Sequence, residues 1–193
     1  MLEQLVNFDT ELFVYLNSLG SETWDGFWMF YTTKFNWIPF YALLLFLMFK
    51  KLDLKVFLYT LIVIALMVAF TDQITNLFKK VLVMRLRPCY NTEINDIIRL
   101  VKSSCGGKYG YFSGHSSNSM AVAIFMGMML KSKFKLMPVI LIIWAVAMGY
   151  SRIYVGVHYP LDVLSGMLFG AFSGYLFYKI FLTIQEKITL KKN

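Results

Sequence analysis

Two long, nearly uninterrupted apolar runs constrain the fold of this chain more than any other feature of its sequence. One is FNWIPFYALLLFLMF at residues 35–49, and the other is VFLYTLIVIALMVAF at residues 56–70. A helix of about 20 apolar residues is long enough to cross the hydrocarbon core of a bilayer. Only 16% of the residues are charged and 58% are hydrophobic, whereas a soluble domain has about a quarter charged residues. These values predict an integral membrane protein and exclude an ordinary cytosolic enzyme or a nucleic-acid-binding tail.

Five apolar segments predict an all-α, polytopic bundle of about five membrane-spanning helices. They cover residues 27–49, 54–78, 116–130, 136–150 and 160–184. Before them, apolar residues recur at roughly helical spacing in residues 1–20, which predicts an amphipathic helix in the membrane interface that ends at Gly20. We expect no cleaved signal peptide, because residues 1–17 contain three acids and no cation. The length predicts a single domain over residues 1–193, with one long loop from Cys89 to Tyr111.

The distribution of lysines predicts the orientation in the membrane. Ten of the nineteen cations fall in two short loops and the C-terminal tail, at positions 50, 51, 55, 131, 133, 135, 179, 187, 191 and 192. Such clustering marks the cytoplasmic side of a membrane protein. The formal net charge of +8 then lies entirely on that side, and the opposite side is formally neutral. We therefore expect a cytoplasmic C-terminus.

The first of three polar clusters on the outer side lies at the exit of the second span. Lys80 and Arg87 are seven residues apart, two helical turns, so a continuous helix would place them on one face. They could hold an anionic ligand or form a juxtamembrane basic patch. Lys79 and Arg85 are interpreted as such a patch, whose side chains reach the lipid phosphates.

The second cluster is Ser113, Gly114 and His115, immediately before the third span. The start of a helix presents unpaired backbone N–H groups and the positive end of the helix dipole, where phosphate binds readily. Gly114 permits a close approach of the backbone to a ligand. Ser113 could cap the helix or donate to an oxyanion, and both interpretations stay open.

The third cluster, SRIYVGVHYPLD, lies before and at the start of the last span and contains Arg152, His158 and Asp162. Pro160 suits the first turn of a helix, which places His158 just outside it and Asp162 in its first turn. A carboxylate there could accept a proton from one ring nitrogen of His158 and leave the other free for nucleophilic attack. Ionisable groups near a bilayer are costly and indicate a functional site.

Together the clusters resemble the three-part signature of the type 2 phosphatidic acid phosphatase and haloperoxidase superfamily, K-x6-RP, PSGH and SR-x5-H-x3-D. The stretch from residue 80 to residue 162 carries it in the family's order. Phe112 stands where the family usually has proline. The resemblance implies a helical core of that family and a membrane lipid phosphatase.

The resemblance also implies a role for each matching residue. His158 would attack phosphorus and form a phosphohistidine, oriented by Asp162, and His115 would be the general acid and then the base that activates water. The three phosphoryl oxygens would be held by five groups, namely Lys80, Arg87, Arg152, Ser113 and the Gly114 amide. Such a site gains its rate from positioning and from cationic stabilisation of equatorial charge. We expect no metal and no cofactor, because no ligand cluster with metal spacing occurs.

The two cysteines, Cys89 and Cys105, flank the loop between the first two motifs on the side expected to be oxidising. We predict a disulfide that stabilises the fold by roughly 3 kcal/mol; two unpaired thiols are the alternative.

Among functions, small bacterial members of the family with this plan look most like undecaprenyl diphosphate phosphatases, acting on a lipid in the outer leaflet of the cytoplasmic membrane. Alternative substrates are phosphatidylglycerophosphate, phosphatidate and lipid A. A vanadate haloperoxidase is disfavoured because those relatives are soluble. A non-enzymatic transporter or scaffold that binds lipid head groups would leave His158 and Asp162 without a purpose. The expected partners are the lipid phosphate and the bilayer, with no nucleic acid and no obligate protein partner.

Overall fold

The computed structural model describes the backbone of residues 1–190 and is nearly all helical over that range. Lys191 and Lys192 of the basic tail lie outside the described residues. The seven α-helices are α1 Leu2–Ser18, α2 Glu22–Thr32, α3 Ile38–Phe49, α4 Leu54–Leu77, α5 Gly114–Leu130, α6 Met137–Tyr154 and α7 Pro160–Leu190. Three short turns join them: η1 Lys34–Trp37, the π-helical η2 Phe78–Leu82, and η3 Pro88–Tyr90. The expectation of an all-α helical bundle is confirmed.

Helix α5 is the central element, because it packs against α4, α6 and α7 and is buried along much of its length. Its contact with α7 depends on three glycines of α7 spaced four residues apart, Gly166, Gly170 and Gly174. A Cβ atom on Gly170 would lie 2.2 Å from the carbonyl oxygen of Ser117 in α5, and one on Gly174 would lie 2.5 Å from that of Ala121. Such small-residue stripes let helices in membranes approach closely.

Three helices of the described chain are long and apolar enough to cross a membrane: Leu54–Leu82, Met137–Tyr154 and Pro160–Lys187. A fourth span is possible if α2 and the segment Lys34–Phe49 count as one, although they are bent by 65°. The expected helix over residues 27–49 is therefore interrupted. Thr33 is extended, with φ −81° and ψ 107°, and Pro39 stands in the first turn of α3. Helix α5, with 17 residues, is shorter than these three and is enclosed by its neighbours.

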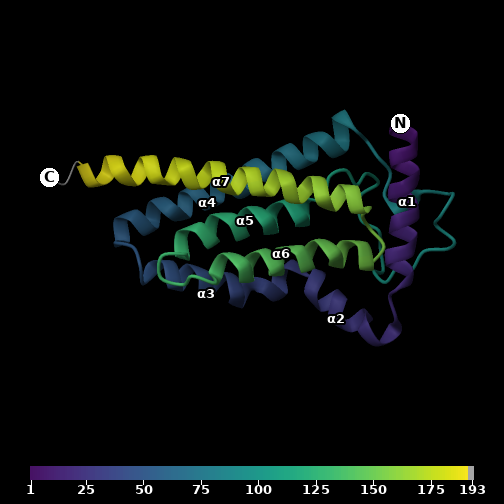
Figure 1. Ribbon diagram of the computed structural model, residues 1–193, viewed down its shortest axis with the longest axis horizontal. Helices are drawn as coiled ribbons and strands as arrows, with labels where there is room; N and C mark the ends of the chain where they lie inside the picture. Colours follow the sequence, from purple (N-terminus) through teal and green to yellow (C-terminus); the bar gives the residue numbers. More distant parts are fainter. Residues whose placement is uncertain (191–193) are drawn as a thin grey trace.

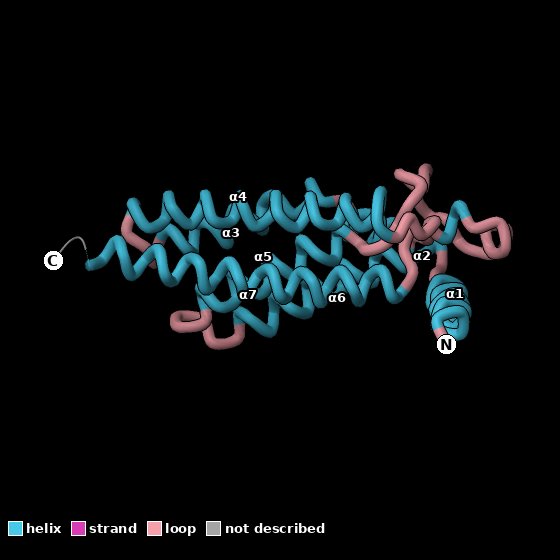
Figure 2. The backbone as a smooth tube through the Cα atoms, turned by 90° about the horizontal axis from the view of Figure 1, so that it is seen from above, coloured by secondary structure: helices cyan, strands magenta, loops and turns pink. Residues whose placement is uncertain are grey.

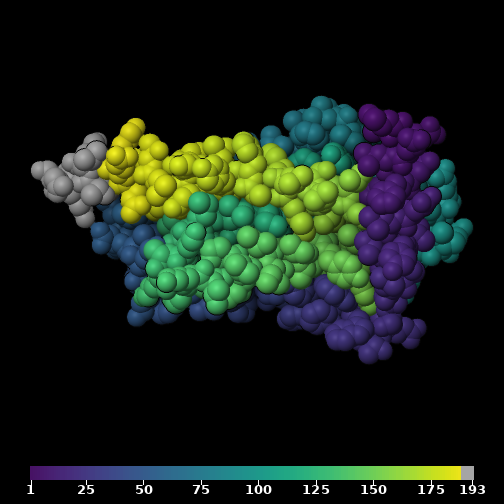
Figure 3. All heavy atoms as spheres, in the orientation of Figure 1, coloured from purple at the N-terminus to yellow at the C-terminus, as the bar shows by residue number. Residues whose placement is uncertain are grey.

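The expected amphipathic helix corresponds to α1, which crosses one end of the bundle roughly at right angles to the long helices (Figures 1 and 2). Figure 3 shows α1, in purple, lying against the beginning of α7. The loop after α4 lies at this same end. The loops that join α3 to α4 and α5 to α6, which carry the clustered lysines, lie at the opposite end (Figure 1). The bundle thus separates the basic loops from the three polar clusters.

Candidate active site

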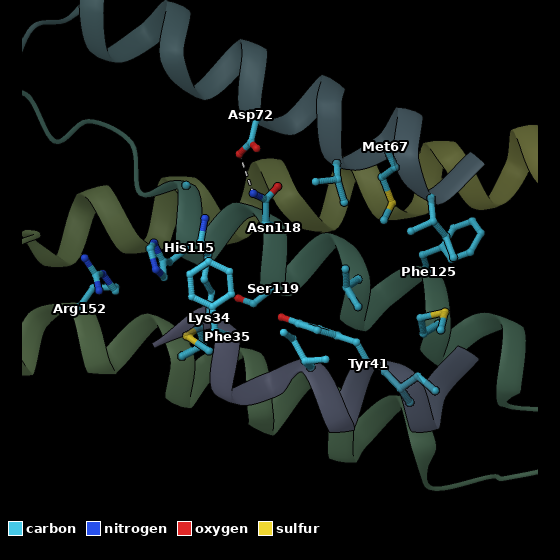
Figure 4. Close-up of a pocket in the computed structure, with 18 of the residues that line it drawn as sticks. Lys34, Phe35, Tyr41, Met67, Asp72, His115, Asn118, Ser119, Phe125 and Arg152 are labelled. Atoms are coloured by element: carbon cyan, nitrogen blue, oxygen red, sulfur yellow. Dashed lines mark hydrogen bonds between the residues drawn. The ribbon is translucent and has the colours of Figure 1, made fainter. Parts of the chain in front are cut away.

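A cavity of about 750 Å³ inside the bundle is lined by residues from all three polar clusters. His115 comes from the first turn of α5, Arg152 from the last turn of α6, and His158 from the loop before α7. Arg87 reaches the cavity from the loop after α4. Figure 4 shows His115 and Arg152 close together at one end of the cavity. The fold therefore brings together residues that are up to 71 positions apart in the chain.

His158 and Asp162 form the most deeply buried polar pair of the site. The exposed fraction is 1% for His158 and 0% for Asp162. Asp162 Oδ2 lies 3.2 Å from His158 Nδ1 and also accepts the backbone N–H of Tyr159 at 3.2 Å. With its proton on Nδ1, the imidazole donates to the carboxylate and keeps Nε2 as an unprotonated nucleophile. Burial, and then the charge of Arg87, hold the pKa of His158 well below its ordinary value, so the neutral ring is favoured.

The guanidinium groups of Arg87 and Arg152 are fixed by the protein and face the cavity. Arg87 Nη1 donates to the carbonyl oxygen of Cys105 at 2.7 Å, and its Nε donates to that of Tyr109 at 3.3 Å. Arg152 is 3% exposed and donates through Nη1 to Thr32 Oγ1. A buried cation is costly unless it meets an anion. These two arginines therefore provide pre-positioned charge for an anionic ligand.

The lysine of the first cluster differs from the sequence expectation. Lys79 lines the cavity, and a Cβ atom on Gly114 would lie 3.5 Å from its Nζ. Lys80 is exposed and is not among the residues that line the cavity. The expectation assumed a regular α-helix, but residues 78–82 form a π-helical turn with a different residue period. Lys79 follows Thr71 and Thr75 at intervals of four and so continues the buried face of α4, whereas Lys80 is exposed. The spacing of Thr71, Thr75 and Lys79 is the sequence signal that could have identified Lys79.

Arg85, which the sequence interpretation places in a lipid-facing patch with Lys79, also lies largely inside the protein. Its Nη1 is 2.6 Å from Asp9 Oδ2 and 3.3 Å from Asp162 Oδ1. Its guanidinium carbon lies 3.8 Å from the centre of the Tyr159 ring. The lipid-patch interpretation of Lys79 and Arg85 is therefore wrong, because Lys79 lines the cavity and Arg85 contacts two buried acids.

At the start of α5 the structure separates the roles that the sequence left open. Ser113 is completely buried and caps the helix, since its Oγ accepts the N–H of Ser116 at 3.4 Å. Gly114 and His115 line the cavity. Phe112, in the position where the family usually has proline, is 4% exposed, and its ring packs 5.1 Å from Phe78 and 5.2 Å from Phe169. Apolar packing thus holds this loop in place.

Two features of the loop after α4 position the site: Gly110, which lies close to the His158–Asp162 pair, and a disulfide bond. A Cβ atom on Gly110 would lie 3.0 Å from Asp162 Oδ2 and 3.4 Å from His158 Nδ1, so only glycine fits without displacing the pair. Sequence reasoning missed Gly110, because nothing in the local pattern distinguishes it. Cys89 and Cys105 are joined as a disulfide, with their Cα atoms 6.2 Å apart. This link ties together the loop that holds Arg87.

Away from the histidines the cavity continues into an apolar chamber between α3, α4 and α5. Figure 4 shows Tyr41, Met67 and Phe125 around this part. Between the two parts lies a polar pair that the sequence analysis missed: Asn118 donates through Nδ2 to Asp72 Oδ1 at 2.7 Å. An acid within an apolar span is costly, which is a signal that could have identified Asp72. The cavity therefore has a cationic part, a polar pair and an apolar chamber in sequence.

Comparisons with known proteins agree with this arrangement. The family model described as the PAP2 superfamily matches residues 58–186. A lipid A 4'-phosphatase of Bacteroides thetaiotaomicron is 38% identical over 93% of this chain and 80% of its own length. An undecaprenyl-diphosphatase of Sulfolobus acidocaldarius is 34% identical over 90% of this chain and 79% of its own length.

Among solved structures, a transmembrane PAP2-type phosphatidylglycerolphosphate phosphatase of Bacillus subtilis superposes with a TM-score of 0.70. It shares 22% identity, and the match covers 96% of this chain and 88% of that one. At this identity the likeness shows the fold alone. The family match includes all three clusters, and the fold places them around one cavity. The chain therefore belongs to the PAP2 superfamily and is a membrane lipid phosphatase, a phosphoric ester hydrolase.

Proposed function

We propose that the enzyme removes a phosphate group from a saccharolipid of the lipid A class, through a phosphohistidine on His158. The observation that carries this proposal is the buried His158–Asp162 pair, which opens into a cavity that is cationic at one end and apolar at the other. A phosphate bound beside Arg87 and Arg152 would place its lipid portion in the apolar chamber. The substrate is thus expected to be amphiphilic, with the phosphate at the boundary between its polar and apolar parts.

The proposed reaction has two displacements at phosphorus. In the first, the Nε2 lone pair of His158 forms the P–N bond while the P–O bond to the sugar breaks, and His115 gives a proton to the departing oxygen. The phosphate dianion itself favours the protonated form of His115. In the second, His115 takes a proton from water, whose oxygen displaces His158 and yields inorganic phosphate. Arg87, Arg152 and Lys79 stabilise the equatorial oxygens in both steps.

Two observations support a saccharolipid as the substrate. Relatives named lipid A 4'-phosphatase match at 38% identity over 93% of the chain and, in Porphyromonas gingivalis, at 31% over 96%. In addition, the Asp72–Asn118 pair offers hydrogen-bonding groups between the cationic and apolar parts of the cavity. A carboxylate there repels phosphate, but it accepts hydrogen bonds from hydroxyl or amide groups of a sugar.

Undecaprenyl diphosphate, the substrate that the sequence resemblance favoured, is the second candidate. It is supported by the 34% identity to the undecaprenyl-diphosphatase of Sulfolobus acidocaldarius. An isoprenoid diphosphate has no sugar, so it would offer no hydroxyl or amide group to the Asp72–Asn118 pair. For either substrate we propose the cytoplasmic membrane as location, with the cavity on the outer side and the C-terminus in the cytoplasm, because the clustered lysines lie at the opposite end of the bundle.

Phosphate release by the purified protein in detergent tests the substrate. Lipid A, undecaprenyl diphosphate and phosphatidylglycerophosphate are compared by kcat/KM, and mass spectrometry identifies which phosphate of lipid A is lost. We expect lipid A to be preferred and His158→Ala to be inactive on every lipid. In Asp72→Asn, we expect a loss of at least tenfold on lipid A and little change on undecaprenyl diphosphate. A preference for undecaprenyl diphosphate, unchanged in Asp72→Asn, would support the second candidate instead.

A further inference from the structure

The crosswise helix α1 has a narrow buried face that reaches both sides of the His158 loop. This face consists of Asp9, Phe13 and Asn17, spaced four residues apart, while most of α1 is exposed. Asn17 Nδ2 donates to the carbonyl oxygens of Ile153 at 3.1 Å and Tyr154 at 2.9 Å, at the end of α6. These contacts fasten α1 to the chain segment immediately before the loop.

The other side of the loop is held by Asp9. Its Oδ1 accepts the backbone N–H of Leu161, in the first turn of α7, at 2.8 Å. The ring of Phe13 packs edge-on against that of Tyr159, with 5.3 Å between the centroids. Asp9 is 1% exposed, and a buried carboxylate is strongly unfavourable without charged and hydrogen-bonding partners. Its position at the first turn of α7 therefore requires an explanation.

The explanation lies in Arg85, which connects Asp9 with the carboxylate of the catalytic pair. A single nitrogen, Nη1, lies 2.6 Å from Asp9 Oδ2 and 3.3 Å from Asp162 Oδ1. Asp162 uses its other oxygen, Oδ2, for His158. The contacts thus run in series from α1 through Arg85 and Asp162 to the imidazole. The guanidinium is also held over the Tyr159 ring, 3.8 Å from its centre.

We propose that Asp9 is a positioning residue, through which α1 fixes the orientation of Asp162 and hence of the His158 nucleophile. Asp9 does not line the cavity, so it acts on the reaction only through Arg85 and the Leu161 amide. Without its charge, Arg85 would be attracted to Asp162 alone and would draw that carboxylate away from the imidazole. This inference rests on the phosphohistidine mechanism proposed above.

The test compares Asp9→Asn with Glu11→Gln, which removes an exposed acid from the same helix. Both are assayed with a lipid phosphate that the wild type hydrolyses. We expect kcat of Asp9→Asn to fall at least tenfold with KM within about twofold of the wild type, because reaction geometry is lost while the binding groups remain. Glu11→Gln keeps both values. Asp9→Glu, which retains the charge, is expected to recover part of kcat.

A double-mutant cycle separates positioning from a general loss of stability. Arg85→Met is expected to lower kcat, and adding Asp9→Asn to it is expected to cause little further loss, because the connection is already broken. Asn17→Ala weakens the docking of α1 without touching Arg85, and it is expected to lower the unfolding midpoint with a smaller effect on kcat. The proposal is overturned by an Asp9→Asn variant with wild-type kcat, by additive losses in the cycle, or by an equal loss of kcat in Asn17→Ala.

The His158→Ala variant distinguishes a failure of the phosphohistidine mechanism from a failure of the Asp9 proposal. If the wild type is active and His158→Ala keeps that activity, the phosphohistidine is wrong whatever Asp9 does. If His158→Ala is inactive while Asp9→Asn keeps the wild-type kcat, the mechanism stands and the positioning role of Asp9 fails.

Discussion

At the residue scale, the chemistry of the site depends on polar and charged side chains that are largely buried. His158 and Asp162 are buried in contact with each other, and Arg87 and Arg152 face the same cavity. In such surroundings electrostatic interactions are stronger than in water, so pre-positioned cations stabilise a developing phosphoryl charge effectively. The identity of the third cation, Lys79 or Lys80, is the sharpest difference between the sequence motif and the structure.

The two lysines can be distinguished by a matched pair of variants. Because Lys79 lines the cavity and Lys80 is exposed, Lys79→Ala is expected to lower kcat/KM about a hundredfold, the loss typical for one group that stabilises transition-state charge. Lys80→Ala is expected to lower it by less than about threefold. Phosphate release with the preferred lipid measures both values. The reverse ranking would show that the regular helical register of the motif holds in the membrane.

The depressed pKa of His158 predicts a specific pH dependence of stability. The ordinary pKa is 6.5, and burial together with Arg87 lowers the pKa in the folded state. Below pH 6.5 the unfolded chain binds a proton that the folded chain does not, so stability is lost as the pH falls. Between pH 7.5 and 5.5 the loss from this group reaches about 1 kcal/mol. His158→Asn is expected to show a smaller drop of the thermal midpoint over this interval; an equal drop would contradict the assignment.

At the element scale, the ends of helices carry the function and their middles carry the packing. The first turn of α5, the last turn of α6, the loop before α7 and the loop after α4 all contribute to the cavity. The glycines of α7 allow α5 and α7 to approach closely, which brings these ends together. The loop after α4 has few regular elements, so its geometry depends on cross-links such as Cys89–Cys105 and on the hydrogen bond from Arg87 to the Cys105 carbonyl.

The cross-link predicts a combined effect on stability and on substrate binding. In the double variant Cys89→Ser and Cys105→Ser, loss of the cross-link is expected to destabilise the protein by roughly 3 kcal/mol. KM is expected to rise more than kcat falls, because the loop that holds Arg87 becomes more mobile. Thiol labelling of the denatured, unreduced wild type checks the premise directly. Two reactive thiols there would rule out the disulfide.

At the scale of the whole molecule, the bundle has two distinct ends. One end holds α1, the long loop and the polar clusters, and the other holds the lysine-rich loops and the end of α7 (Figure 1). The cavity runs from the first end into the apolar interior. A lipid in the leaflet at the first end would place its phosphate at the histidines and its chains along α3 and α4.

Orientation in the membrane is tested by single cysteines placed at exposed positions of the two ends. Glu93→Cys lies in the long loop and Lys133→Cys lies in the loop between α5 and α6. A membrane-impermeant maleimide is expected to label residue 93 in intact spheroplasts and residue 133 only after permeabilisation. The wild type, with its cysteines paired, is the unlabelled control. Labelling of residue 133 in intact cells would place the site on the cytoplasmic side.

The sequence by itself determined the membrane environment, the all-α fold and the three polar clusters that the fold brings to one cavity. Long apolar runs are compatible with few environments, because a bilayer core requires helices of about 20 apolar residues. The three motifs occur in the order of the family signature, and the family is now established. Even the superseded interpretation of Lys79 and Arg85 correctly located a cluster of cations at the exit of the second span.

Only the tertiary structure decided which lysine faces the cavity, what Arg85 binds, and why α1 carries a buried acid. The helix ends in a π-helical turn at residues 78–82, so an α-helical period does not relate the two lysines to Arg87, and propensities do not reveal such a turn. Asp9 and Asp162 are 153 positions apart in the chain, yet one guanidinium nitrogen lies beside both carboxylates. Contacts of this kind arise when helices distant in sequence pack together. Such packing depends on the shape of the whole bundle, which a local sequence pattern does not reveal.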